Sequence, residues 1–291
     1  MSGYIRPVDN TATQHDGTET LAINDSIARR LLWVIALRIA ARFARDCYPC
    51  VPVSKHLIIK SGPFVHLTEA ATLAYLAEKT SLPVPHVHCA FVHKKQAVIV
   101  MERIQGTSLA EAWASWSDED RESIFEQLRC MFRELRALPP PPDGGISSCV
   151  GGSLRDSRIP RSWPRFGPFK TTQDFHFWLR HELQLEQHPE RKDDQDWKDI
   201  KEMVAKQDGH WPPPVFTHGD LNPSNILVRG NQVVGIIDWE FSGWYPHYWE
   251  YTSAWYWGLM RPWWQEAIAK FLDPHPEELK MEITRQKWWG E

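Results

Sequence analysis

Hydrophobic residues of the first hundred positions follow two different periods. From Asn24 to about Tyr48 they recur three or four positions apart, which is typical of one face of an α-helix. Short apolar runs bounded by turn residues follow at His56–Lys60, Val87–His93 and Ala97–Met101, and these runs predict strands. The last two runs flank Lys94-Lys95-Gln96 and should form a hairpin. This part of the chain therefore predicts a small sheet with helices packed on it.

Helical spacing dominates the rest of the chain. Thr68 is expected to cap a helix that runs to about Lys79. Ser117, with Asp120 three positions on, predicts the start of a longer helix that continues to about Leu138. Further helices are expected at residues 108–116, 172–187 and 194–207 and from residue 246 to the end, with strands at 215–217, 226–228 and 233–237. The order predicts an α+β fold of two lobes, the first small and β-containing, the second larger and mainly helical.

Polar breaks divide the chain into three parts. Residues 1–23 are polar and without period, and we expect a flexible tail. Residues 24–102 should form the N-lobe, and residues 103–291 the C-lobe. A segment at 143–170, rich in Gly, Pro, Arg and Ser, should be a long loop. Its arginines are expected to be solvated, with phosphate binding as the alternative: Arg155, Arg158, Arg161 and Arg165.

Composition narrows the class of partner and the compartment. The 291-residue chain has a formal net charge of −4, so no basic surface indicates a nucleic-acid partner. Its five cysteines do not suggest a disulfide framework, and we expect reduced thiols in a soluble, cytoplasmic protein. Leu31–Leu37 is far shorter than the roughly 18 apolar residues of a membrane-spanning helix, so no membrane partner is expected. The basic face of the first helix leaves membrane-surface binding as an alternative. The oligomeric state is not predicted.

Candidate chemistry gathers in residues 218–240. Two apolar runs around Gly230-Asn231 predict a β-hairpin. Asp220 and Asn225 precede its first strand, and Asp238 follows the second, so the three side chains should converge at one end. Two carboxylates and an amide oxygen are hard ligands that suit Mg²⁺. The alternative is a polar hairpin in which these residues only form turns.

The spacing within this hairpin indicates a phosphotransferase. Asn225 stands five positions after Asp220 and Asp238 eighteen, as in a kinase catalytic loop followed by its metal-binding Asp. Gly219 after the His, and Asp238-Trp239-Glu240 in place of Asp-Phe-Gly, distinguish the chain from protein kinases. The stretch resembles the aminoglycoside phosphotransferase family, a small-molecule branch of the kinase-like fold. Residues 236–251, IIDWEFSGWYPHYWEY, are similar to its fungal members in particular.

The resemblance implies an ATP- and Mg²⁺-dependent kinase that phosphorylates a hydroxyl of a small molecule. Asn225 and Asp238 would hold Mg²⁺, and Asp220 would accept or orient the proton of the acceptor hydroxyl. Three further residues would support them: His218 would brace the loop, Asn222 would hydrogen-bond across it, and Glu240 would assist the metal site.

The resemblance also implies a nucleotide site in the N-lobe. Lys60, at the end of a strand, would bind the α- and β-phosphates, and Glu69, in the first turn of a helix, would orient that lysine. Backbone groups near Glu102 and Ile104, between the lobes, would hydrogen-bond adenine. Taken alone, Lys60 could be a solvated strand end, and Glu69 could simply offset the helix dipole.

One feature departs from the family pattern. A phosphate-covering glycine loop should precede Lys60, yet Gly17 is the last glycine before it. A catalytically silent kinase-like module that binds a nucleotide or a partner is therefore an alternative. A choline- or homoserine-type kinase is another, because it shares the fold and differs only in the acceptor pocket.

Overall fold

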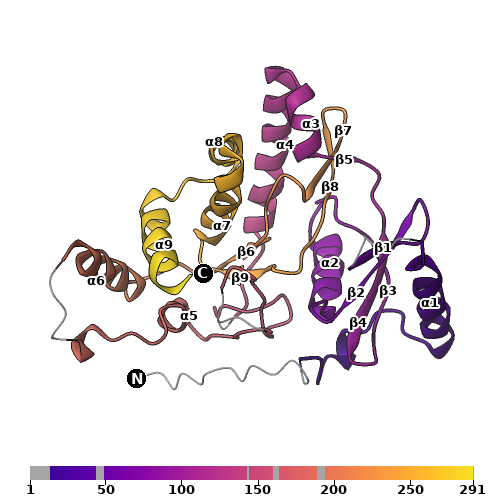
Figure 1. Ribbon diagram of the computed structural model, residues 1–291, viewed down its shortest axis with the longest axis horizontal. Coiled ribbons are helices and arrows are strands. Elements are labelled where there is room, and N and C mark those ends of the chain that lie inside the picture. Colours follow the sequence, from indigo (N-terminus) through magenta and orange to yellow (C-terminus); the bar gives the residue numbers. More distant parts are fainter. Residues whose placement is uncertain (1–13, 44–48, 143, 160–163, 189–193, 291) are drawn as a thin grey trace.

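A four-stranded antiparallel sheet forms the small lobe of the computed structural model, which describes residues 14–43, 49–142, 144–159, 164–188 and 194–290 (Figure 1). Its strands lie in the order β1 (Cys50–Pro52), β2 (Leu57–Gly62), β4 (Gln96–Glu102) and β3 (Val87–His93). The predicted hairpin is present as β3 and β4, paired antiparallel. The three-residue strand β1 was not predicted from the sequence, because so short a run carries no clear period.

Helices cover both faces of this sheet, and strand alternation decides which side chains meet which helix. Ala97, Ile99 and Met101 of β4 join the core beneath α2 (Leu67–Lys79), whereas Val98 and Val100 point to the opposite face, where α1 (Ile27–Ala40) packs. Lys60 is the cross-strand partner of Ile99. Its side chain therefore points to the α2 side of the sheet, toward the large lobe.

The start of α2 differs from the prediction by two residues. His66, not Thr68, is the N-cap, and its Nδ1 accepts a hydrogen bond from the Thr68 backbone N–H at 3.2 Å. Thr68 is buried within the first turn, where its hydroxyl lies 3.4 Å from Arg165. The cap is a histidine, a residue that N-cap preferences do not single out.

Residues 14–23 pack on the small lobe, so the predicted tail is corrected for this segment. Ile23 exchanges two backbone hydrogen bonds of 2.9 Å with Ala90 of β3. The Gln14 carbonyl lies 2.8 Å from His66 Nε2, and a 3₁₀ helix, η1, spans Glu19–Leu21. These partners are distant in sequence, so no local pattern announced them. Residues 1–13 lie outside the described part of the chain.

The large lobe is built from helices around three short strand pairs. Strand β5 (Thr107–Ser108) pairs with β7 (Ile226–Arg229), which pairs with β8 (Gln232–Ile236), and β6 (Val215–Thr217) pairs with β9 (Gly243–Tyr245). The helices are α3 (Leu109–Ala112), α4 (Asp118–Arg136), α5 (Thr172–Leu179), α6 (Gln195–Gln207), α7 (Trp249–Trp257), α8 (Pro262–Phe271) and α9 (Pro276–Trp289). Short 3₁₀ helices follow α3, α5 and α7 at Trp113–Ser115, Leu185–Gln187 and Gly258–Met260.

Most predicted elements of this lobe are present, with two differences. Ser117 caps α4 as predicted, accepting from the Asp120 backbone N–H. Helix α5 ends at Leu179 rather than near residue 187, because His181 and Glu182 have positive φ. Strand β9 lies between residue 237 and residue 246, where the sequence predicted neither a strand nor a helix.

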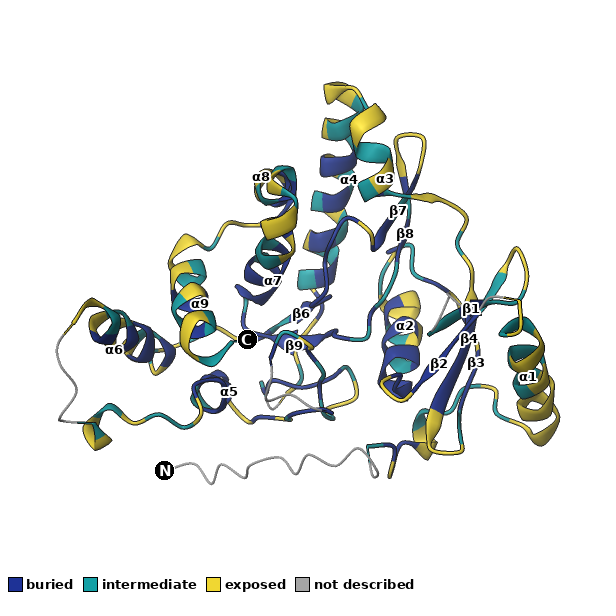
Figure 2. Cartoon of the chain, in the orientation of Figure 1, coloured by how far each residue is buried: buried dark blue, intermediate teal, exposed yellow. Residues whose placement is uncertain are grey.

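Apolar side chains of the two lobes share one core, which runs from α2 through the β7–β8 hairpin to α4 and α8 (Figure 2). Trp239 and Trp264 are among its largest fully buried side chains. A second core joins α5, α6 and α9. Four cysteines, Cys50, Cys89, Cys130 and Cys149, are free thiols in the described part of the chain. No described helix is long and apolar enough to cross a membrane.

Candidate active site

The loop before β7 holds Asp220 through two amide side chains. Asn225 Nδ2 donates to the Asp220 carboxylate and to its backbone carbonyl, both at 2.9 Å. Asn222 Nδ2 lies 3.1 Å from the same carbonyl and 3.4 Å from the carboxylate. The Ile237 backbone N–H donates to the Asn225 carbonyl at 2.9 Å, which ties the end of β8 to the start of β7. The hairpin therefore brings Asp238 close to this loop.

His218 fastens the loop to the hairpin as a neutral imidazole. Its Nε2 donates to the Ile237 carbonyl at 3.0 Å, and its Nδ1 accepts from the Asp220 backbone N–H at 3.1 Å. Burial lowers the pKa of His218 to about 4, so the ring stays uncharged at neutral pH. The ring centroid of Trp239 lies 4.4 Å away. Trp239 thus packs on the loop histidine and donates its own Nε1–H to the Ile236 carbonyl at 2.8 Å.

Gly219 follows His218 because the backbone leaves no room for a side chain there. Its φ is +82°, and a Cβ at this position would lie 2.6 Å from the Phe241 carbonyl oxygen. Asp238 also has a positive φ, of 66°, a conformation that Asp tolerates better than most residues.

Glu250 of α7 is a second anchor of the loop, and the sequence analysis missed it. Its carboxylate accepts from the backbone N–H groups of His218 at 2.6 Å and Gly219 at 3.2 Å. Burial raises the pKa of this carboxyl, and the two N–H donors act in the opposite direction. The signal available in the sequence was a single acidic residue among the aromatic residues of Tyr248–Trp257, since a buried carboxylate needs donors.

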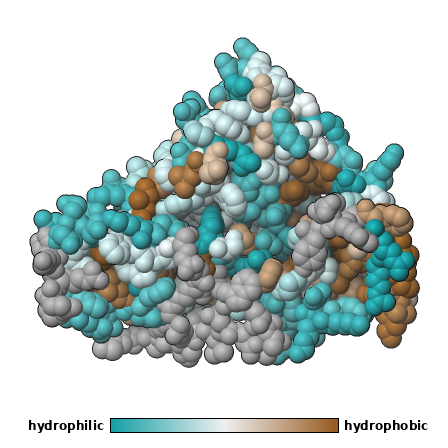
Figure 3. Space-filling view, in the orientation of Figure 1, coloured by the Kyte–Doolittle hydropathy of each residue, from teal (hydrophilic) through white to brown (hydrophobic). Residues whose placement is uncertain are grey.

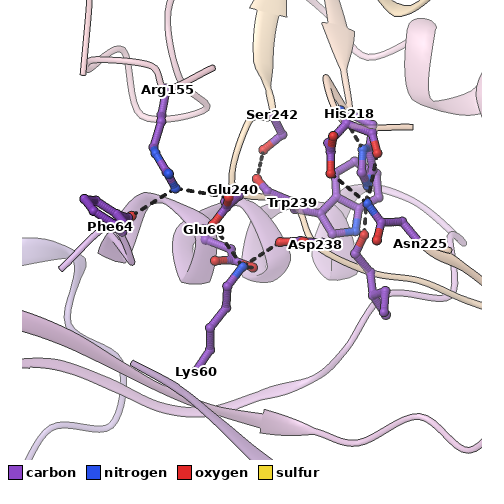
Figure 4. Close-up of polar contacts among 12 residues, drawn as sticks. Lys60, Phe64, Glu69, Arg155, His218, Asn225, Asp238, Trp239, Glu240 and Ser242 are labelled. Carbon is purple, nitrogen blue, oxygen red and sulfur yellow. Dashed lines mark hydrogen bonds and ion pairs between the residues drawn. The ribbon is translucent and has the colours of Figure 1, made fainter. Parts of the chain in front are cut away.

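Lys60 joins the N-lobe to the carboxylates of the site (Figure 4). Its Nζ lies 2.9 Å from Glu69, 2.6 Å from Asp238 and 3.2 Å from Glu240. Burial alone would lower the pKa of Lys60, but the three carboxylates outweigh it and raise that pKa well above its ordinary value. For Glu69, burial dominates and raises the pKa despite the lysine. Lys60 and Glu69 thus form a buried ion pair across β2 and α2.

Three carboxylates surround this single lysine. Ligand atoms of Glu69, Asp238 and Glu240 all lie within 4.8 Å of one another. Glu240, predicted as a helper of the metal site, bonds Lys60 directly and also accepts from Arg155 at 3.0 Å. Negative charge therefore exceeds positive charge around Lys60, which favours a further cation.

Asp220 has one oxygen free to interact with a substrate. Its Oδ1 is buried and has no hydrogen-bond partner among the described residues. Burial raises the pKa of Asp220 to about 7; the Arg158 guanidinium acts against this rise, and the Asp238 and Asp156 carboxylates add to it. A carboxylate with a pKa near neutrality is well suited to exchange a proton with a bound hydroxyl.

The family of the chain follows from a match to a family model together with this geometry. The model described as the phosphotransferase enzyme family matches residues 66–278, most of the chain and all of the loop and hairpin. The chain belongs to the phosphotransferase enzyme family. The resemblance to aminoglycoside phosphotransferases inferred from the hairpin is thereby confirmed.

Solved structures of aminoglycoside phosphotransferases share the fold of this phosphotransferase. The apo form of a thermostable mutant of APH(4)-Ia matches with a TM-score of 0.54 and 15% identity, over 81% of this chain and 79% of that one. A thermostable mutant of the same enzyme in ternary complex with AMP-PNP and hygromycin B gives 0.53 and 16%, over 79% and 76%. The predicted two-lobed, kinase-like α+β fold is confirmed. None of the curated proteins compared with the chain matches it significantly.

Arginines of the long loop enter the site of the phosphotransferase, which corrects the expectation that they are solvated. Arg155 donates to the Phe64 carbonyl at 3.3 Å (Figure 4). Its guanidinium lies over the rings of Phe64 and Phe241, 5.2 and 5.3 Å from their centroids. Arg158 bonds Asp156, with Nε 2.8 Å from its carboxylate, and also bonds the Gly219 carbonyl.

Arg165 is the third arginine of the loop that turns inward, and its side chain is buried. It donates to the Ser153 carbonyl at 2.6 Å and to the Ser153 hydroxyl at 2.8 Å. Arg161 lies outside the described residues. The loop carries these side chains inward because backbone pairs at Ile146–Phe169 and Leu154–Phe166 fold it back on itself.

The segment between the lobes holds the two residues predicted to contact adenine. Glu102 ends β4, and its backbone N–H donates to the His86 carbonyl at 2.9 Å. The Ile104 side chain lies against Gly235 of β8, where an added Cβ would come within 2.8 Å of it. The Ile104 backbone N–H has no hydrogen-bond partner in the described part of the chain. Ile104 therefore lies at the lobe junction with a free backbone donor.

Proposed function

We propose that this phosphotransferase uses ATP and Mg²⁺ to phosphorylate a hydroxyl group of a small molecule. The observation that carries the proposal is Asp220, whose free, buried Oδ1 lies in the same short loop as Asn225 and beside the hairpin that presents Asp238 to Lys60. The APH(4)-Ia complex named above, with AMP-PNP and hygromycin B, supports a nucleotide donor and a small-molecule acceptor for this fold.

Nucleotide binding is assigned to the small lobe and the lobe junction. Lys60 would bind the phosphates that are not transferred, held in place by Glu69. The free N–H of Ile104 and the carbonyl of Glu102 would hydrogen-bond the adenine edge. Lys60 is buried at 4% exposure, so its charge would act in a low-dielectric environment, where it is strongest.

Asn225 and Asp238 fit Mg²⁺ as the proposed ligands. Asn225 uses its Nδ2 on Asp220, which turns its oxygen away without a hydrogen-bond partner among the described residues. Asp238 brings a partly exposed carboxylate, and Glu240 and Glu69 add negative charge nearby. When bound, Mg²⁺ neutralises the charge of the nucleotide phosphates. Hard oxygen ligands and excess negative charge are what this ion requires.

Asp220 is assigned the acceptor side of the reaction. Its Oδ1 would accept the hydroxyl proton, while Asn222 and Asn225 hold the other oxygen. His218 and Glu250 would keep the loop backbone in place without contacting the substrate. Catalysis of phosphoryl transfer depends on positioning and charge more than on covalent chemistry, and these contacts supply positioning.

The test compares two substitutions that remove different functions. Asp220→Asn keeps shape and hydrogen bonds, so Mg·ATP binding should persist while turnover falls by roughly 10²–10⁴-fold. Asp238→Asn should weaken both Mg·ATP binding and turnover, because the metal serves both. Asp199→Asn, on a partly exposed part of α6 in the large lobe, is the matched control and should change neither.

Transfer from labelled ATP to a panel of small hydroxyl compounds, with hydrolysis of ATP as a second readout, measures turnover, and calorimetry measures binding. A wild type that binds Mg·ATP but transfers phosphate to no acceptor and hydrolyses none would instead support a silent kinase-like module. Equal binding of ATP with and without Mg²⁺ would remove the metal assignment.

A further inference from the structure

Helix α1 carries more apolar surface than the small lobe covers. Its inward side chains, Trp33, Val34 and Leu37, pack against the outer face of the sheet. That face is formed by alternate residues of β2, β3 and β4: Ile59, Cys89, Phe91, Val98 and Val100. This contact explains why the helix is present, but it uses only one side of it.

The opposite side of α1 carries a row of exposed apolar side chains. Ile27, Leu31, Ile35 and Ile39 stand four positions apart and are 80%, 60%, 53% and 53% exposed. Leu32 and Phe43 extend the row, and none of the residues of α1 is buried. Figure 3 shows hydrophobic residues gathered at the edge of the small lobe where α1 lies. Single exposed apolar residues are ordinary, whereas a continuous row indicates a contact surface.

The charge of this segment is of one sign. Residues 26–45 contain no Asp or Glu, although the whole chain carries a net charge of −4. Arg29, Arg38 and Arg42 are exposed along it, and Arg30 is paired with Asp25. Arg38 follows Ile35 by three positions and Leu31 by seven, so it lies on the exposed apolar side of the helix. The surface is therefore apolar with a positive border.

The apolar and positively charged side chains of this surface indicate which kind of partner it can bind. A second copy of the chain would bring arginines against arginines, because no carboxylate in residues 26–45 could neutralise them. An anionic lipid surface offers both acyl chains for the apolar row and phosphates for the guanidinium groups, which reach them on long side chains. Helix α1 covers the sheet face opposite α2 and Lys60, so this contact would leave the active site accessible (Figure 1).

We propose that the outward face of α1 binds the surface of an anionic phospholipid bilayer, lying parallel to it. Ile27, Leu31, Ile35 and Ile39 enter the boundary between head groups and acyl chains. Arg38 and Arg42 contact lipid phosphates. This binding requires no kinase activity, so it does not depend on the proposed function.

The test measures sedimentation of the full chain with two kinds of vesicle. One contains about three parts phosphatidylcholine to one part phosphatidylserine, and the other phosphatidylcholine alone. The wild type should bind the first kind more tightly, and added salt should weaken that binding. Leu31→Ser with Ile35→Ser should reduce it by roughly a hundredfold, because two large apolar side chains lose their burial in lipid.

Two further variants make the outcome specific. Arg38→Gln with Arg42→Gln should weaken binding about thirtyfold, which corresponds to about 1 kcal/mol for each arginine near the surface. Leu259→Ser with Met260→Ser, two exposed apolar residues of the large lobe, is the matched control and should bind as the wild type does. All variants change exposed residues, so circular dichroism should report an unchanged fold.

Two results would overturn the proposal. The first is no binding of the wild type to either vesicle. The second is a dimer in solution, seen by sedimentation equilibrium, that Leu31→Ser with Ile35→Ser dissociates; it would make a second copy the occupant of this face. Vesicle binding without any phosphotransfer activity would leave the proposal standing and count only against the proposed function.

Discussion

Individual side chains hold the loop before β7, which carries Asp220, in place. The most informative of them is Glu250. One carboxylate receives two consecutive backbone N–H groups, those of His218 and Gly219. Consecutive N–H groups can point the same way only when the backbone turns sharply, and Gly219 with its φ of +82° provides that turn. The orientation of Asp220, the next residue, therefore depends on a side chain of α7.

Replacing Glu250 tests this dependence. Glu250→Gln keeps the shape but turns one acceptor into a donor facing a backbone N–H, which should cost about 1–3 kcal/mol of stability. We expect turnover to fall roughly tenfold through misplacement of Asp220, with Mg·ATP affinity changing less than about twofold. Urea unfolding, turnover and calorimetric binding measure the three effects. Glu266→Gln, exposed on α8, is the control. Loss of ATP affinity in proportion to turnover would contradict a role confined to the loop.

His176 gives stability a defined pH dependence. It is fully buried, with Nε2 2.8 Å from the Tyr248 hydroxyl and Nδ1 3.1 Å from the Gln207 carbonyl, and burial lowers its pKa to about 3. The unfolded chain binds this proton below about pH 6.5 and the folded chain does not, so stability is lost as pH falls through that value.

Between pH 7 and pH 5 the loss from this one group should be about 2 kcal/mol. His176→Gln should be less stable at pH 7 but lose that much less on acidification. Free energies of unfolding in urea at the two pH values measure the slope, with His86→Gln, an exposed site, as the control. Equal slopes in wild type and His176→Gln would show that another group accounts for the pH dependence.

At the scale of elements, the small lobe depends on the segment that precedes α1. Residues 14–23 add a backbone pair to β3 and a contact to the cap of α2, and α2 carries Glu69. Residues 14–23 contact the cap of α2, the cap fixes the start of α2, and α2 holds Glu69 in its ion pair with Lys60. Loss of the segment should therefore affect both the stability of the lobe and the position of Glu69.

Deleting residues 1–23 should lower the melting temperature by several degrees. The four hydrogen bonds that residues 14–23 share with the rest of the lobe, together with their buried side chains, are worth about 2–3 kcal/mol. Deleting residues 1–13 removes none of these contacts and is the matched control. Differential scanning calorimetry measures both. Melting temperatures that agree between the two deletions would mean that residues 14–23 contribute nothing to the lobe.

At the scale of the whole molecule, the site lies where the two lobes meet, and its charge is unbalanced. Lys60 comes from the small lobe, Asp238 and Glu240 come from the hairpin of the large lobe, and Arg155 comes from the long loop. A ligand that contacts the small lobe, the hairpin and the long loop together should make these three parts unfold together. Excess carboxylate charge makes a nucleotide without its metal a poor ligand, because like charges would meet.

Mg·ATP should therefore stabilise the molecule as one unit. At a concentration about a hundred times its Kd it should add about 2.7 kcal/mol to the free energy of unfolding, seen as a higher melting temperature with a single transition. ATP with EDTA should give a much smaller shift. Lys60→Met should lose most of the Mg·ATP effect. An equal shift from ATP with and without Mg²⁺ would contradict the charge argument.

The sequence by itself determined the features that depend on neighbours along the chain. Asp220 and Asn225 precede the first strand of a hairpin, and Asp238 follows the second. Two apolar runs and a Gly-containing turn were therefore enough to predict that these residues lie at the same end of it. Lys60 and Glu69 are nine positions apart, joined by a strand, a turn and one helical turn, and the structure places them in a 2.9 Å ion pair. The strand-then-helix order likewise predicted the two lobes, because each pattern extends over many residues.

Tertiary structure alone decided which distant side chains complete the site. Glu250 and Arg158 reach Gly219 from a helix and a loop, and their sequence surroundings show only an acid among aromatic residues and one arginine of several. Helix α1 has apolar residues on two sides, so its period could not say which side would meet the sheet and which would remain exposed. Residues 14–23 lack a period because their partners are a strand and a cap far along the chain. In each case the stabilising contact joins segments that are distant in the sequence, so a local sequence pattern cannot predict it.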